Sequence, residues 1–309
     1  MNDKNSVTCS VTHGVPQGSN LGPLLFLIFI NDFPLANSFF KYNLFADDST
    51  LTCKFNSSNV ATIKSTIESE LQPVLNWLDT SKIKINFDKT KFIIFSYGKK
   101  YDLEYIELGD HQITRAASIK FLGIVIDENL NFRSHADALS NKVSRVNGIL
   151  FRLNNILPPE SLNLLYSALV VPHFTYGIEI WHAALQCNRD RIFKLQKKSI
   201  RAINSLPYND HTHEHFKRLG VLKLEDIYNL KLATVMFNNR IAVSQGDIHS
   251  HNTRQRNNLV TPRYNRERSK SSWMYQGICL WNSLHPDLKN VRSEGAFKYG
   301  LKRSYLANY

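Results

Sequence analysis

The chain has 309 residues, of which 43% are hydrophobic and 21% are charged. This composition supports one large domain or two modest ones with a hydrophobic core, and it excludes a wholly disordered protein. The formal net charge of +12 suggests a polyanionic partner, either nucleic acid or an anionic membrane, although many proteins are simply basic.

The first predicted element is a helix that follows a turn-rich segment, His13–Ser19. Ser19 or Asn20 can cap this helix, and Pro23 suits its first turn. The run Leu24–Phe33 is apolar on nearly every face, which is typical of a buried helix.

Further along, apolar residues recur at helical spacing and predict an amphipathic helix over about 58–79, capped by Ser57 or Ser58. Residues 83–87 alternate between apolar and polar side chains, which predicts a half-buried strand. Residues 92–95 predict another strand.

The pattern changes near residue 130, after a predicted strand over 119–126 that is interrupted by Gly123. Helical patterns then dominate, over 135–155, 159–185 with an interruption at Pro172, 187–206 and 223–243. The expected fold is therefore α+β, a small antiparallel sheet with packed helices followed by mainly helical regions. The expected domains are 1–130, 131–186 and 187–309.

An acidic turn lies within the predicted strand–turn–strand of residues 43–53. Asp47 and Asp48 are adjacent there, and neighbouring carboxylates at the tip of a hairpin can hold a divalent metal where phosphates arrive. Asp-Asp-Ser-Thr is also good turn chemistry, so the pair alone does not distinguish a metal site from a structural turn.

The order of the motifs resembles that of the reverse transcriptases of non-LTR retrotransposons, the LINE-type, jockey-like family. His13–Phe26 is similar to motif B of that family and Phe45–Asp48 to motif C. Residues 85–91 are similar to motif D, and Phe121–Ile124 to the motif E primer grip. The resemblance continues C-terminally and covers nearly the whole chain, through residues 166–181, 210–224 and 280–286.

The resemblance implies a partial polymerase palm over 1–130, a helical thumb-like region over 131–186 and a basic nucleic-acid-binding region over 187–309. It implies an RNA template, a DNA primer and deoxynucleotides as partners, and Mg²⁺ or Mn²⁺ held by Asp47 and Asp48, with no structural cofactor. Lys89 or Lys91 would be the motif D lysine near the leaving pyrophosphate. The residues implied at the template, nucleotide and primer are Pro16, Gln17, Gly18, Ser19, Phe121, Leu122 and Gly123.

Motif A of the family, a strand with the other metal-binding aspartate, is expected well upstream of motif B. Only 12 residues precede His13, and Asp3 is the sole acid among them. Two-metal chemistry uses carboxylates from different strands, so we expect the chain to be inactive alone unless another polypeptide supplies motif A. The motif C hairpin would then expose an unpaired, apolar edge.

The positive charge is concentrated in residues 187–309, with 22 Lys and Arg against 9 Asp and Glu. One predicted helix face carries Arg191, Lys194, Lys198 and Arg201, which suits contact with phosphates. Residues 254–270 predict an arginine-rich arm with aromatic neighbours, suited to single-stranded nucleic acid. The arginines of this arm are Arg254, Arg256, Arg263, Arg266 and Arg268.

Other conspicuous residues have plainer interpretations. The run from His211 to His215 predicts a helix start capped by Asp210 or Thr212 in preference to a zinc site, because residues two apart do not share a helix face. Trp77 and Trp181 lie on apolar helices and are expected in the core.

The remaining sequence features favour an intracellular protein, cytoplasmic or nuclear, without a membrane partner. The four cysteines form no CxxC pair, residues 1–10 are polar, and the longest apolar run, Leu24–Ile30, falls short of the ~20 residues that span a bilayer. Two functions remain open: part of an RNA-directed DNA polymerase, or a non-catalytic remnant that binds RNA or DNA through its basic region.

Overall fold

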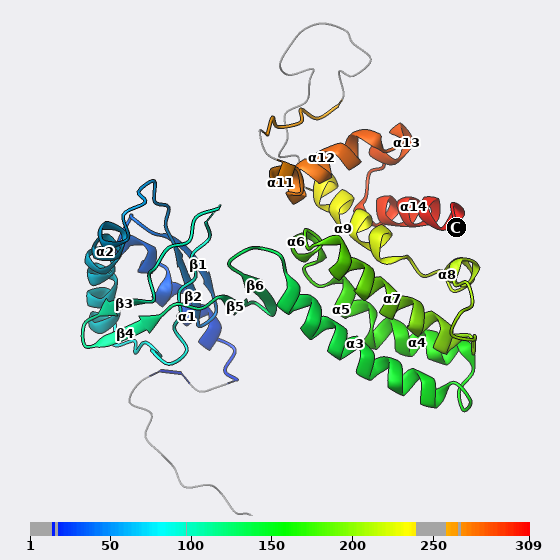
Figure 1. Ribbon diagram of the computed structural model, residues 1–309, viewed down its shortest axis with the longest axis horizontal. Coiled ribbons are helices and arrows are strands. Elements are labelled where there is room, and N and C mark those ends of the chain that lie inside the picture. The colour runs from blue at the N-terminus through cyan, green and yellow to red at the C-terminus, as the bar shows by residue number, and fades with distance from the viewer. Residues whose placement is uncertain (1–13, 16–17, 97, 239–257, 265–266) are drawn as a thin grey trace, which may run out of the picture. The chain divides into compact units, whose positions relative to one another are not determined.

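The computed structural model describes residues 14–15, 18–96, 98–238, 258–264 and 267–309 (Figure 1). The chain divides into two compact units, Met1–Ala116 and Ala117–Tyr309. The first unit combines helices with two small hairpins, and the second begins with a hairpin and continues with helices. The fold is thus of the expected α+β kind, and the division assigns residues 118–127 to the mainly helical unit.

The first unit has three helical segments and two antiparallel hairpins in its described part. Its elements are α1 (Gly22–Ile30), the 3-10 helix η1 (Phe33–Leu35), β1 (Lys41–Phe45), β2 (Asp48–Thr52), α2 (Val60–Thr80), β3 (Tyr105–Leu108) and β4 (His111–Thr114). The strands form separate two-stranded sheets, β1–β2 and β3–β4. The core of the unit includes Phe33, Phe40 and Val74, and Trp77 packs against it as expected.

Helix α1 forms where the sequence predicts it, but the prediction that it is buried is wrong. Only Gly22 and Ile30 are buried, whereas Leu27 and Ile28 are 60% and 66% exposed. A helix that is apolar all round needs neighbours on every side to be buried. The described part of the first unit covers only a narrow stripe of α1.

Helix α2 is amphipathic as predicted, but its cap lies one residue further on. Asn59 is the N-cap, and its side chain accepts hydrogen bonds from the backbone of Ala61 and Thr62. Ser57 supports the cap indirectly, because its hydroxyl accepts from the Asn59 backbone N–H at 3.1 Å.

The two strands predicted around the Lys-Thr-Lys segment do not form. Residues 83–86 join no ladder among the described residues, and of 92–95 only Phe92 makes an isolated bridge, to Arg115. Alternation marks which side chains are half-buried, but a strand also needs a partner backbone. The pairing strands are instead β3 and β4, which the sequence reasoning did not predict.

The second unit begins with the hairpin β5 (Ser118–Phe121) and β6 (Ile124–Asp127). Its helices are α3 (Arg133–Leu153), α4 (Pro159–Leu169), α5 (Val171–Thr175), α6 (Ile178–Trp181), α7 (Gln186–Ile203), α8 (His213–Arg218), α9 (Leu224–Asn238), α11 (Glu267–Lys270), α12 (Trp273–Ser283), α13 (Pro286–Lys289) and α14 (Glu294–Ala307). The predicted helical stretches are therefore confirmed within the described residues, including the interruption near Pro172.

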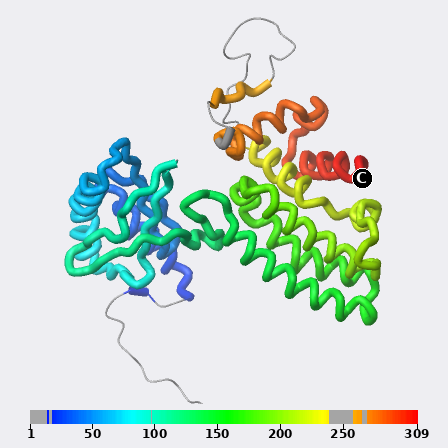
Figure 2. The backbone as a smooth tube through the Cα atoms, in the orientation of Figure 1, coloured from blue at the N-terminus to red at the C-terminus, as the bar shows by residue number. Residues whose placement is uncertain are grey.

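Helices α3, α4 and α7 pack together as a bundle, and α12 and α14 pack against α9 (Figures 1 and 2). Trp181 and Tyr166 are fully buried in the bundle core, as expected for Trp181. No helix in the described ranges combines the length and apolarity needed to cross a bilayer.

One carboxylate organises the passage from the β5–β6 hairpin into α3. Asp127, at the end of β6, accepts backbone hydrogen bonds from Asn129, Asn131 and Phe132. Because these N–H groups precede the first turn of α3, Asp127 fixes the direction in which the helix leaves the hairpin.

Candidate functional site

The acidic turn is the tip of the β1–β2 hairpin. Phe45 pairs with Asp48, so Ala46 and Asp47 form a two-residue loop. Such loops require a positive φ at their first position, and Ala46 has φ 52°. The hairpin therefore sets the two aspartates side by side at the turn, as the sequence predicts.

Packing on one face of this hairpin holds the tip in place. Tyr42, Leu44 and Leu51 pack against the core of the first unit. Asp47 and Asp48 are exposed, and their side chains have no hydrogen-bond or ion-pair partner among the described residues. Their carboxylate oxygens are thus free to accept a cation.

The hairpin supplies two carboxylates and no more. Within the described ranges there is no group of three or more His, Cys, Asp or Glu side chains that could hold a metal ion. Oxygen donors fit Mg²⁺ or Mn²⁺, which commonly bind through one or two carboxylates together with water and substrate phosphates. The donor set fits one side of such a site.

The glycine-rich turn before α1 is described only in part. Gly18 has φ +85° and open surroundings, because no heavy atom lies within 4 Å of the place that a Cβ would take. The N-cap of α1 is Leu21, which makes no side-chain capping hydrogen bond, so the prediction of Ser19 or Asn20 as the cap is wrong. The Ser19 hydroxyl nevertheless accepts from the Gly22 backbone N–H at 3.0 Å, in the turn before the helix. Pro16 and Gln17 lie outside the described residues.

The two candidate lysines of the Lys-Thr-Lys segment differ in their surroundings. Lys89 lies in a turn organised by Asn86, whose side chain accepts from the Lys89 backbone N–H at 3.2 Å. The Lys91 ammonium donates to the Thr114 hydroxyl at 2.9 Å, next to the β3–β4 hairpin. Both side chains are exposed, so either ammonium can reach an anion.

The Phe121–Gly123 segment forms the turn of the β5–β6 hairpin. Leu122 and Gly123 have φ angles of 44° and 87°, as a two-residue hairpin loop with two positive φ positions requires. Tyr176 donates its hydroxyl hydrogen to the Leu122 carbonyl. A Cβ at position 123 would lie 3.3 Å from the Tyr176 ring, so glycine leaves room for this contact.

The basic residues predicted on one helix face line one groove. The groove has a volume of about 530 Å³ and lies along α7, with Ser140 and Ser144 of α3 on its other side. Its cationic lining comprises the four predicted residues, Arg191, Lys194, Lys198 and Arg201, together with Lys197. Ile192, Ser199 and Ala202 lie on another face of α7 and are fully buried. Leu195, which follows the same helical interval, is half-buried and lines the groove.

Sequence reasoning missed several residues of this groove. Helical spacing could have identified Lys197, because it lies three residues after Lys194 and so shares its face of the helix. No sequence pattern marks the two serines of α3. Tyr208 and Asn209 come from the turn after α7 and reach the groove only through the fold.

Three of the five arginines of the arginine-rich arm lie beyond the described ranges. Arg254, Arg256 and Arg266 are outside them, and Arg268 belongs to α11. Arg263 is described and exposed. The arm's role as a nucleic-acid contact stays a prediction.

The histidine run starts α8 at Thr212, one of the two predicted caps, although the Thr212 side chain makes no capping hydrogen bond. The His213 ring contacts Lys223, whose ammonium lies 2.9 Å from Nδ1. A helix start is therefore confirmed for this segment.

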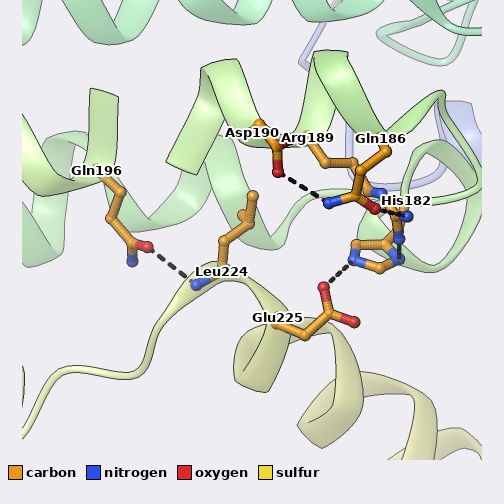
Figure 3. A network of polar contacts seen from close by, with 7 residues as sticks. All are labelled: His182, Gln186, Arg189, Asp190, Gln196, Leu224 and Glu225. Atoms are coloured by element: carbon orange, nitrogen blue, oxygen red, sulfur yellow. Dashed lines mark hydrogen bonds and ion pairs between the residues drawn. The ribbon is translucent and has the colours of Figure 1, made fainter. Parts of the chain in front are cut away.

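A partly buried polar network joins α6, α7 and α9 (Figure 3). His182 lies 3.0 Å from Glu225 through Nε2 and 3.3 Å from Arg189 through Nδ1. Its ring stacks on Tyr228 at 3.7 Å between centroids. Burial raises the pKa of Tyr228 to about 12, so this ring stays neutral.

A second part of the network lies deeper in the core. Gln196 of α7 donates to the Leu222 carbonyl at 2.9 Å. It also accepts from the Leu224 backbone N–H at 2.9 Å (Figure 3). These bonds connect α7 to the first turn of α9. The network thus orients the groove helix.

Residues 1–126 match the reverse transcriptase (RNA-dependent DNA polymerase) family. The chain is 27% identical over 227 residues to the RNA-directed DNA polymerase from mobile element jockey of Drosophila melanogaster, covering 70% of this chain and 24% of that protein. It is 31% identical over 206 residues to the probable RNA-directed DNA polymerase from transposon BS of the same species, covering 63% and 22%.

A third relative extends the similarity further along the chain. The probable RNA-directed DNA polymerase from transposon X-element of Drosophila melanogaster is 28% identical over 261 residues, covering 82% of this chain and 27% of that protein. The chain thus spans about a quarter of the length of these curated relatives. No solved structure matches it.

Proposed function

We propose that this chain, a relative of the reverse transcriptases of non-LTR retrotransposons, is part of an RNA-directed DNA polymerase. The observation that carries the proposal is the β1–β2 hairpin. It presents Asp47 and Asp48 at an exposed tip within the family-matched residues. The reaction is template-directed transfer of a nucleotide to the 3′-hydroxyl of a primer.

In this proposal residues 1–130 are the palm portion, 131–186 a thumb-like region and 187–309 a basic nucleic-acid-binding region. The open surroundings of Gly18 suit a close approach of template or nucleotide to the backbone. The rigid Leu122–Gly123 turn suits support of the primer end, and Lys89 or Lys91 suits the leaving pyrophosphate.

Asp47 and Asp48 would hold Mg²⁺ or Mn²⁺, because exposed carboxylates without other partners in the described structure are suitable oxygen ligands. When bound, the metal neutralises charge on the phosphates of the nucleotide. The protein's own part is to hold the two carboxylates at a fixed tip, which the packed face of the hairpin does.

A further carboxylate completes the site in this proposal. Two-metal transfer uses carboxylates from different strands, and the hairpin contributes only one turn. The outer edges of β1 and β2 are unpaired among the described residues, so a strand that carries another aspartate has backbone to pair with. The matched region makes up 24% of the mobile element jockey protein and 22% of the transposon BS protein. A chain as long as these relatives has room for such a strand.

Primer extension on an RNA template with Mg²⁺ or Mn²⁺ tests the proposal. We expect no extension by the 309-residue chain and metal-dependent extension by a longer product of the same reading frame that includes an aspartate-bearing upstream strand. Asp47→Asn in the longer product should abolish extension, whereas Asp79→Asn, an exposed acid at the end of α2, should not. Extension by the 309 residues alone would contradict the need for a further carboxylate.

A second candidate function follows from the basic groove. A chain that binds RNA or DNA through α7 without chemistry would explain why the cationic residues gather on one face. Stop codons directly upstream of the reading frame, or a longer product that binds nucleic acid but never extends a primer, would favour this alternative. Either function has an intracellular site of action, cytoplasmic or nuclear.

A further inference from the structure

The groove along α7 has an unbalanced charge. Five cationic side chains line it, and its described lining holds no acidic residue. The acid in contact with this set is Asp137 of α3, which forms an ion pair with Arg191 at 2.6 Å. One carboxylate against five cations leaves a surface that favours a polyanion.

Most of these cations have no polar partner in the described structure, although the Lys197 ammonium lies 4.5 Å from the centroid of the Phe193 ring. Lys194, Lys197 and Lys198 form no ion pair or hydrogen bond with the residues that the structure describes. Arg191 has two enclosed guanidinium nitrogens, Nε and Nη2, without a hydrogen-bond partner in the described structure, and the Ser140 hydroxyl is likewise unpartnered. Enclosed polar groups are normally satisfied, so unpartnered donors along a cationic groove point to a ligand rich in acceptor oxygens.

Arg201 differs from the lysines because it holds the wall of the groove. Its Nε and Nη2 donate to the Asp210 carbonyl at 3.1 and 2.9 Å. These bonds fix the turn after α7, which carries Tyr208. Arg201 is thus a positioning residue as well as a positive charge.

Tyr208 stands at this wall with most of its surface in solvent. Its side chain is 74% exposed, and its ring centroid lies 6.0 Å from the Lys198 ammonium and 5.9 Å from the Arg201 guanidinium carbon. An exposed aromatic ring beside cations is the arrangement on which proteins stack unpaired bases. A base inside a duplex cannot offer its face to such a ring.

We infer that the α7 groove binds single-stranded RNA or DNA, with the phosphates along Lys194, Lys197 and Lys198 and one base stacked on Tyr208. The cationic face from Arg191 to Arg201 rises about 15 Å along the helix, enough for a short run of backbone. The inference rests on the proposed function only in taking nucleic acid as the polyanion. It requires neither divalent metal nor Asp47.

Fluorescence anisotropy with the full chain tests this inference in the presence of EDTA. The probes are labelled oligo-U RNA, oligo-dT DNA and a blunt duplex of equal length. We expect tighter binding of the single strands than of the duplex. Tyr208→Ala should weaken single-strand binding about 5-fold to 100-fold, whereas Tyr208→Trp should retain it.

The matched aromatic control is Tyr299→Ala, which removes a ring that is 69% exposed on α14. It should leave the affinity unchanged. Binding should weaken in the triple variant Lys194→Gln, Lys197→Gln and Lys198→Gln. The slope of log K against log salt concentration should also become shallower, by about 0.7 for each phosphate contact that is lost. The control is the double change Lys302→Gln and Arg303→Gln at exposed positions of α14. It should leave both the affinity and its salt dependence unchanged.

Three results would overturn the inference: no binding of any probe, equal binding of duplex and single strand, or a Tyr208→Ala variant with unchanged single-strand affinity. Circular dichroism of each variant identifies loss of fold. Because the assay excludes divalent metal and nucleotides, its outcome is independent of whether the chain polymerises DNA.

Discussion

Ser199 of α7 donates its hydroxyl hydrogen to the side-chain oxygen of Asn147 in α3, at 2.5 Å and out of contact with solvent. Asn147 in turn donates to the Leu195 carbonyl at 3.0 Å. This buried pair sits between the two helices that border the basic groove. It therefore fixes the register of one helix against the other.

Removing this pair should cost stability. Asn147→Ala removes two buried hydrogen bonds, leaves the Ser199 hydroxyl only the Leu195 carbonyl at 3.2 Å, and opens a small cavity. The free energy of unfolding should therefore fall by about 1–3 kcal/mol. Urea denaturation followed by circular dichroism measures this change. Asn141→Ala, an exposed asparagine on the same helix, should change stability by less than about 0.5 kcal/mol.

Replacing Gln196 should cost more stability than replacing Asn147, because the Gln196 side chain forms hydrogen bonds with three groups in the core. It donates to the Tyr166 hydroxyl and the Leu222 carbonyl, and it accepts from the Leu224 backbone. Gln196→Leu should lower the free energy of unfolding by about 2–5 kcal/mol. An unchanged Tm would show that the core can rearrange around leucine. Gln276→Leu, at an exposed position of α12, is the control.

Two glycines should respond oppositely to alanine. Gly177 has φ +58°, and a Cβ there would clash with the Ile124 side chain of β6, so Gly177→Ala should cost about 1–2 kcal/mol for the backbone alone. Gly148 lies inside α3 with nothing within 4 Å, so Gly148→Ala should add about 0.5–1 kcal/mol. Thermal denaturation of the two variants compares them directly.

Because of the His182–Glu225 contact, the free energy of unfolding should decrease as the pH falls into the acidic range. The hydrogen bond from His182 lowers the pKa of Glu225 below its ordinary value, and the charges of His182 and Arg189 lower it further. A carboxyl with a lowered pKa stabilises the fold fully above its unfolded pKa, and this contribution is lost as the pH falls through the folded value.

Glu225→Gln should therefore narrow the difference in urea midpoint between neutral pH and pH below about 4. The effect should be modest, because the Glu225 side chain is 62% exposed. Glu214→Gln, an exposed acid without an ion pair among the described residues, should keep the wild-type dependence. A Glu225→Gln variant with the full wild-type dependence would contradict the assignment.

The sequence predicted the local elements of this fold better than their surroundings. Periodicity located α2, α3 and α7 because each helix buries one face, and the acidic hairpin followed from its turn. The burial of α1 could not be predicted in the same way. Its apolar residues report a preference for burial, whereas actual burial depends on which other segments are present.

The same limit applies to the candidate sites. The spacing of Arg191, Lys194, Lys198 and Arg201 predicted a common face, because helical geometry alone determines it. The contribution of Tyr208 depends on a turn that folds back beside α7, and no local pattern encodes that approach. The strand predicted over 83–87 failed for a similar reason, since pairing requires a second backbone at hydrogen-bond distance.

Helix α7 divides its positions between two tasks. Ile192, Ser199 and Ala202 are fixed by the core, whereas the lysines of the groove lie on the outer face of the helix. Substitutions on the outer face can therefore adjust the strength of binding without repacking the protein. In this one helix the residues that set the strength of binding are therefore separate from the residues that hold the core together.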